Sequence, residues 1–212
     1  MYLIFPNDPS TDFLKEVINH SIELFPEINL VECEASDDSY TATKDFLATI
    51  PEGRTIFFVG HGSLDSLYGG ASHEVEKRPL ITLKNINLFK NSKLILMACN
   101  STGFLESSRK MRNFSDGLGF GLLPSEMREL QVNRKIREIG LAEDDLDKFK
   151  EILIALFKKI ISKVARGEHC IESLATFVST YISKLINELV TDKNMVKVAK
   201  LLFYVKKDLI SG

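Results

Sequence analysis

The chain has 212 residues, 44% of them hydrophobic and 26% charged, which is close to the composition of an average globular domain. A chain of this length can bury a full hydrophobic core, alone or with an appended helical part. The formal net charge of −2 gives no sign of nucleic-acid binding, and no apolar run approaches the ~18–20 residues that span a membrane.

The first half of the chain alternates between strand and helix patterns. Apolar or alternating runs predict strands at Tyr2–Phe5, Ile28–Cys33, Thr55–Val59 and Lys93–Ala98. Helical spacing predicts a helix capped by Ser10, another at Ser39–Ile50, and a short helix or turn at Leu83–Phe89. Glycines from Gly60 to Gly70 mark a loop or hairpin. This order predicts an α/β fold with a parallel sheet and helices on both of its faces.

The second half is mostly helical. Residues 112–124 are rich in Gly, Ser and Asn and are interpreted as a loop around a short strand. Helices are then predicted at Ser125–Ile139, Glu143–Ala165, Ile171–Leu189 and Asn194–Leu209, with Gly167 ending the second. We therefore expect one domain over residues 1–212, with a sheet-forming part at 1–124 and a helical part at 125–212.

The three cysteines indicate a reducing compartment. Cys33, Cys99 and Cys170 are an odd and sparse set, which fits poorly with a disulfide scaffold. None of them has the spacing of a zinc site. Met1 is followed directly by apolar residues, without the basic region of a signal peptide. The sequence predicts a cytoplasmic protein that needs no metal or other cofactor.

Two of the buried-strand runs end in residues with reactive side chains. Residues 56–60 lead into His61, and residues 94–98 lead into Cys99, which is 38 positions later. In parallel sheets, sites form beyond the carboxyl ends of the strands, and neighbouring strands are ~4.8 Å apart. If these two strands are neighbours, the imidazole and the thiol lie above the same edge of the sheet.

A thiol needs such a neighbour to act as a nucleophile at neutral pH. Its ordinary pKa of ~8.5 leaves little thiolate, which a nearby imidazole or a helix N-terminus increases. Asn100 or Ser101 can cap a helix directly after Cys99. The N–H groups of Gly62 and Cys99 are candidates for an oxyanion hole.

Structural explanations remain open for the same residues. Cysteines at strand ends are often core residues, and histidines there often serve as hydrogen-bonded structural residues. Asp65 and Asp116 are candidates for recognising a basic substrate side chain, or are solvated loop carboxylates. The region of Gly60, Gly62, Gly69 and Gly70 lacks the Lys-Ser/Thr ending of a phosphate-binding P-loop.

The two motifs Phe57-Phe58-Val59-Gly60-His61-Gly62 and Leu94-Ile95-Leu96-Met97-Ala98-Cys99-Asn100-Ser101 resemble the caspase-like (clan CD) cysteine peptidases, and most of all their CHAT branch. The resemblance implies a three-layer α/β/α sandwich and a catalytic dyad of His61 and Cys99. A weaker similarity covers residues 153–176. The chain departs from the family because it has no tryptophan and no confident strand after the cysteine helix. Residues 114–124 either line the substrate groove or form that strand.

The expected function is therefore that of a cysteine endopeptidase (thiol protease) that cleaves a protein or peptide. The resemblance implies a place in bacterial antiviral defence or regulated cell death, and a regulatory partner or a homodimer would suit it. Asp65, Asn100, Ser101 and Asp116 are the candidate substrate-binding residues. One alternative is a non-catalytic interaction module on the same fold. Another is a flavodoxin-like binder of a small molecule.

Overall fold

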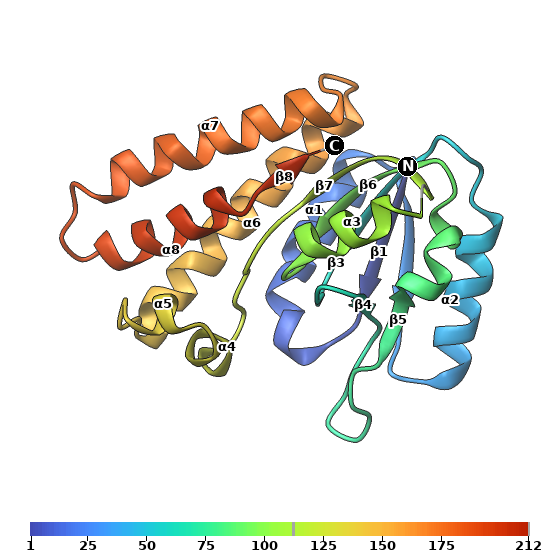
Figure 1. Ribbon diagram of the computed structural model, residues 1–212, viewed down its shortest axis with the longest axis horizontal. Helices are drawn as coiled ribbons and strands as arrows, with labels where there is room; N and C mark the ends of the chain where they lie inside the picture. The colour runs from blue at the N-terminus through green and yellow to red at the C-terminus, as the bar shows by residue number, and fades with distance from the viewer. Residues whose placement is uncertain (112, 212) are drawn as a thin grey trace.

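The computed structural model describes residues 1–111 and 113–211, which fold around one main sheet (Figure 1). The sheet has the order β2-β1-β3-β6-β7-β8. Its strands are β1 (Tyr2–Pro6), β2 (Asn29–Cys33), β3 (Thr55–Val59), β6 (Ser92–Met97), β7 (Phe114–Gly119) and the two-residue β8 (Ile210–Ser211). The first five are parallel, and β8 pairs with β7 in the antiparallel sense. The predicted α/β fold with a mostly parallel sheet is confirmed.

Alternating side chains of the central strands enter two separate hydrophobic layers. Phe57 and Val59 of β3 face one layer, whereas Ile56 and Phe58 face the other. All four are fully buried, as expected for strands that are covered on both faces. This double burial explains why these strands read as continuous apolar runs.

Helices cover both faces of the sheet (Figure 1). One layer holds α2 (Asp37–Thr49), the 3-10 helix η2 (Leu83–Phe89) and α3 (Ser101–Arg109). The other holds the 3-10 helix η1 (Pro9–Leu14), α1 (Lys15–Leu24) and the long α6 (Glu143–Ala165). A small hairpin of β4 (Ser66–Tyr68) and β5 (Pro79–Thr82) follows β3 at the carboxyl edge of the sheet.

The C-terminal region is helical, as predicted. After α6, the chain forms α7 (Ile171–Leu189) and α8 (Val196–Lys207), which pack against each other and extend the core of α6 outward (Figure 1). Gly167 ends α6 with a φ of 70°, a conformation that glycine adopts without strain. Within the described residues, none of the helices has the length and apolarity needed to cross a bilayer.

Two local predictions were wrong. The cap of the first helix is Asp8, whose carboxylate accepts the N–H of Ser10, so Ser10 lies inside η1. The single helix expected at Ser125–Ile139 is divided into α4 (Met127–Val132) and α5 (Arg134–Arg137). The division occurs because Asn133 has an extended backbone and its side chain caps α5.

The short strand expected within the loop at residues 112–124 is β7, which pairs with β6 along its length. Gly119 has no room for a side chain, because a Cβ there would lie 2.8 Å from the backbone nitrogen of Thr102. The close approach of α3 therefore requires glycine in a strand. Arg112, at the start of the predicted loop, lies outside the described residues.

Candidate active site

His61 and Cys99 occupy equivalent positions on two neighbouring parallel strands. β3 pairs with β6 so that Val59 is opposite Met97, and each candidate residue lies two positions beyond that pair. The pairing continues past the strands, because the Gly60 N–H donates to the Met97 carbonyl at 3.2 Å. The β4–β5 hairpin then holds the far side of His61, whose carbonyl accepts the N–H of Tyr68 at 3.1 Å.

Both side chains lie on the same face of the sheet. Cys99 continues the row of Ile95 and Met97 into the layer covered by α1 and α6. His61 and Cys99 together line a small cavity of about 20 Å³, which Leu153 and Phe157 of α6 close. The two side chains are 7% and 8% exposed, so each is nearly excluded from water. The geometry brings the two predicted residues to one enclosed place.

The His61 ring is held by two residues that follow β1. Its Nε2 lies 2.6 Å from Ser10 Oγ and 3.5 Å from the Asp8 carboxylate. The Ser10 hydroxyl donates its single proton to Asp8 Oδ1 at 2.7 Å, so its oxygen accepts from His61. His61 therefore carries its proton on Nε2, which leaves the lone pair of Nδ1 free to act as a base.

Opposing effects set the pKa values, and therefore the charges, of Asp8 and His61. Burial works to raise the pKa of Asp8, but two hydrogen bonds from Ser10 and the nearby His61 outweigh it and lower that pKa. Burial, with help from Lys77, lowers the pKa of His61 against the attraction of Asp8. At neutral pH the site therefore holds an ionised Asp8 and a neutral His61.

The Cys99 thiol is covered by Gly121–Ser125, here called the cover segment. The thiol donates to the Leu123 carbonyl at 2.9 Å, and the Leu123 N–H lies 3.2 Å from the sulfur. Burial, followed by the charge of Glu129, raises the pKa of Cys99 to about 12. Cys99 is therefore a neutral thiol in this conformation, and it is shielded from an incoming substrate.

Hydrogen bonds fix the cover segment at both ends. The Gly121 carbonyl accepts the N–H of Asn100 at 2.7 Å. The Ser125 N–H donates to the carboxylate of Glu129 at 2.7 Å. The side chain of Leu123 is 7% exposed and packs in the core layer of α1 and α6. Opening the site requires these contacts to break.

The backbones of Gly62 and Cys99, the candidate oxyanion donors, approach each other closely. A Cβ on Gly62 would lie 2.6 Å from the Cys99 carbonyl oxygen, so only glycine lets the two backbones come this close. Among the described residues, the hydrogen bonds include none donated by the N–H of Gly62 or of Cys99. Their use as oxyanion donors stays a prediction.

The other predicted site residues differ in their positions. Asp65 is exposed in the loop after Gly62 and accepts a hydrogen bond from Ser63 at 2.8 Å. Asn100 begins α3 in a left-handed conformation, at φ 54°, without a capping bond from its side chain. Both lie near the dyad along the chain.

Ser101 and Asp116 are not available to a substrate at this place. Ser101 is fully buried, donates to the Leu96 carbonyl at 2.8 Å and accepts the N–H of Phe120. Asp116 is opposite Lys93, at the start of β6. At ~3.3 Å per residue, the six positions from Lys93 to Cys99 put Asp116 about 20 Å away, at the other end of the sheet.

Sequence reasoning missed Asp8, Ser10 and the covering role of Leu123. Asp8 directly follows β1, which neighbours β3, so the rule for strand ends that found His61 also applies to it. Leu123 carries no such signal, because its backbone contacts Cys99 and backbone groups are the same in every residue.

The second pair of glycines in the expected glycine-rich loop has a packing role. A Cβ on Gly69 would lie 2.3 Å from the Tyr40 ring, and one on Gly70 would lie 2.2 Å from the Cys33 carbonyl. In the part of the chain that the structure describes, no three His, Cys, Asp or Glu side chains converge in a way that could hold a metal ion.

Comparison of the sequence with protein-family models and with curated proteins finds no match. The likeness to caspase-like peptidases therefore rests on the two sequence motifs.

We expect alkylation to distinguish the thiols of the native protein. Iodoacetamide at pH 7.5 should label Cys170, which is exposed and whose pKa is lowered by hydrogen bonding with Ser173. Cys99 should stay unlabelled until the cover segment opens, so Leu123→Ala should increase its labelling rate by about tenfold or more. Peptide mapping by mass spectrometry measures both rates. Rapid labelling of Cys99 in the wild type, or no effect of Leu123→Ala, would contradict this account of the cover segment.

The buried histidine predicts a loss of stability in mild acid. Because the pKa of His61 is lower in the folded protein than its ordinary value of 6.5, unfolding takes up a proton as the pH falls below ~6.5. The stability supplied by the neutral ring is complete above that pH and is lost progressively below it. The free energy of unfolding, measured with urea, should be lower at pH 5.0 than at pH 7.5, and His61→Gln should make this difference smaller. The control variant His73→Gln, at an exposed histidine, should leave the difference unchanged. An equal pH dependence in both variants would refute the assignment of this effect to His61.

Proposed function

We propose that this protein is a latent cysteine endopeptidase of the caspase-like type, with His61 as the base and Cys99 as the nucleophile. The observation that carries the proposal is the equivalent register of the two residues on β3 and β6, with both facing one small cavity. A sheet with helical layers on both faces supports a three-layer α/β/α sandwich of that kind. Three free thiols suit the reducing conditions of the cytoplasm.

The reaction needs one proton acceptor and one nucleophile. Nδ1 of His61 takes the thiol proton, and the Cys99 sulfur attacks the scissile carbonyl while the N–H groups of Gly62 and Cys99 bind the oxyanion. The carbon–nitrogen bond then breaks, and the imidazolium returns its proton to the leaving amine. Water, deprotonated by His61, hydrolyses the thioester and releases the carboxylic acid together with the Cys99 thiol.

Asp8 and Ser10 support this reaction by holding the His61 ring in place. Asp8 accepts the Ser10 proton, so the Ser10 oxygen accepts from Nε2 and holds the tautomer in which Nδ1 is unprotonated. The negative charge of Asp8, 3.5 Å from the ring, stabilises the imidazolium that forms during the attack. We therefore treat both as positioning residues for His61.

Latency follows from the closed cavity. A space of about 20 Å³ holds no side chain of a substrate, whereas ligand sites usually measure ~300–1,000 Å³.

A second hollow of about 530 Å³ lies on the outer side of Asp8 and Ser10, with Lys77 and Glu126 in its wall. Displacing the cover segment would open Cys99, and we propose that this hollow receives the substrate chain.

A peptide library tests the proposed activity. The wild type and the opened variant Leu123→Ala are incubated with the library, and the products are read by mass spectrometry. Cleavage by either protein that Cys99→Ala abolishes supports the peptidase. If neither protein cleaves any peptide, the proposal is wrong.

One observation favours a different function. A thiol with a pKa of about 12, bonded to the backbone of Leu123, is what a purely structural cysteine would show. The protein would then be a non-catalytic interaction module on the same fold. In that case Leu123→Ala would expose Cys99 to iodoacetamide without producing any cleavage.

A further inference from the structure

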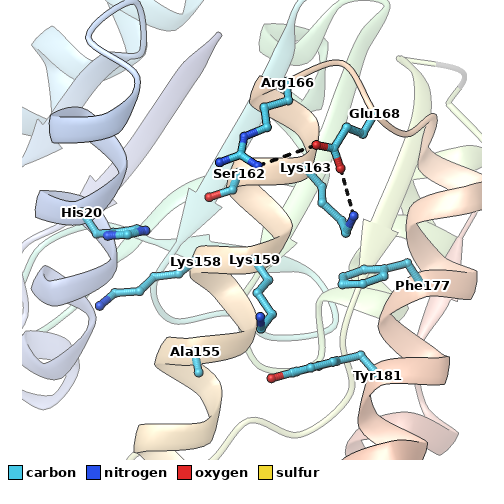
Figure 2. A pocket seen from close by; sticks show the side chains of 10 residues that line it. All are labelled: His20, Ala155, Lys158, Lys159, Ser162, Lys163, Arg166, Glu168, Phe177 and Tyr181. Atoms are coloured by element: carbon cyan, nitrogen blue, oxygen red, sulfur yellow. Dashed lines mark hydrogen bonds and ion pairs between the residues drawn. The ribbon is translucent and has the colours of Figure 1, made fainter.

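A groove on the outer side of the helical layer is separate from the candidate active site. It has a volume of about 520 Å³ and follows the outward face of α6, between α1 and α7 (Figure 2). The inward face of the same helix supplies Leu153 and Phe157 to the cavity beside Cys99. The groove therefore does not depend on the proposed peptidase activity.

Basic side chains of α6 and of the residue that ends it, Arg166, line this groove. They are Lys158, Lys159, Lys163 and Arg166. At a rise of 1.5 Å per residue, they extend over about 12 Å of the helix. Among the residues that the structure describes, two carboxylates are paired with them: Glu16 lies 2.6 Å from Lys158, and Glu168 lies 2.9 Å from Lys163 and 3.8 Å from Arg166. The groove keeps an excess of positive charge, with His20 at its α1 side (Figure 2).

Aromatic rings of α7 form the opposite wall. Phe177 and Tyr181 are stacked, with ring centroids 6.0 Å apart and an angle of 17° between their planes. The ammonium of Lys163 lies 4.7 Å from the Phe177 ring, and that of Lys159 lies 5.3 Å from the Tyr181 ring. On an ordinary solvated helix face lysines extend into water, whereas here the rings hold two of them at the groove.

We infer that this groove binds a nucleoside polyphosphate. The volume is within the range of small-molecule sites, and the cations of the groove, Lys158 on the α1 side and Lys159 and Lys163 on the α7 side, suit several phosphate groups (Figure 2). A planar base can stack on the half-buried rings of Phe177 and Tyr181, as bases do on aromatic side chains. An acidic peptide would use the cations but would have no planar group for the rings.

Calorimetric titration with ATP tests the inference on the full chain, with adenosine and inorganic tripolyphosphate as partial ligands. ATP should bind at one saturable site, more tightly than either partial ligand, and more weakly as salt is raised. Lys163→Ala should weaken ATP binding by about tenfold or more, because it removes a charge-assisted contact. Tyr181→Leu should weaken it about fivefold, because it keeps an apolar side chain but removes the stacking surface.

A lysine outside the groove provides the matched control. Lys148→Ala changes an exposed lysine near the start of the same helix and should leave the ATP affinity within about twofold. The inference is overturned by the absence of saturable ATP binding, or by binding that Lys163→Ala leaves unchanged. Tripolyphosphate binding as tightly as ATP, or a poly-glutamate peptide binding where ATP does not, would equally exclude a nucleotide site.

Discussion

Replacing Cys99 by alanine should abolish peptide cleavage, with a fall in kcat/KM on the order of 10³-fold or more. No other cysteine shares the layer of this site: Cys33 at the end of β2 faces the opposite layer of the sheet, with α2 and α3, and Cys170 is exposed before α7. The loss of the two hydrogen bonds with Leu123 should cost about 1–3 kcal/mol of folding stability. Fluorogenic substrates derived from the library hits measure the rate, and thermal unfolding verifies that the variant is folded.

The control for this variant is Cys170→Ala. Cys170 is exposed and is the more reactive thiol by environment, since hydrogen bonding with Ser173 lowers its pKa. Its removal should leave cleavage unchanged. A folded Cys99→Ala protein that keeps its activity, or a Cys170→Ala protein that loses it, would mean that the nucleophile has been assigned to the wrong residue.

Asp8→Asn should reduce kcat/KM by about 10²–10⁴-fold while leaving the fold intact. An amide can donate a hydrogen bond to Ser10, so the Ser10 proton is free to turn towards Nε2 of His61. The ring then carries its proton on Nδ1, which is the nitrogen that should accept the proton of Cys99. Loss of an orienting carboxylate has effects of this size in serine peptidases.

The ¹⁵N shifts of the His61 ring give a readout that a merely structural role would not change. They should report a proton on Nε2 in the wild type and on Nδ1 in Asp8→Asn, and Ser10→Ala should weaken the preference. Asp12→Asn is the control, because Asp12 lies on the same 3-10 helix and pairs with Lys15 at the surface. Unchanged activity and an unchanged tautomer in Asp8→Asn would remove Asp8 from the mechanism.

The sequence was sufficient to predict the sheet and the edge where the candidate site lies. β3 and β6 are buried on both faces, so they appear as unbroken apolar runs, and the residues after them could be assigned to one edge. Helices α6 and α7 were predicted with their observed bounds, because their apolar residues repeat with helical spacing against a continuous core.

Close backbone contacts explain what could not be predicted. β7 contains Gly117 and Gly119 because Leu105 and the start of α3 occupy the space of their side chains, so the strand lacks an apolar pattern. The tautomer of His61 depends on a contact across 51 positions of sequence to Ser10. The cover over Cys99 depends on the peptide groups of Leu123, which no residue pattern can report.

The most direct test of the dyad is covalent capture. The protein and its Leu123→Ala variant are treated with a peptidyl acyloxymethyl ketone whose peptide comes from the library hits, and the adduct is located by tandem mass spectrometry. We predict one adduct, on Cys99, that forms faster in Leu123→Ala and is lost in His61→Ala. Adducts only on Cys170, or a Cys99 adduct whose rate does not depend on His61, would contradict the account.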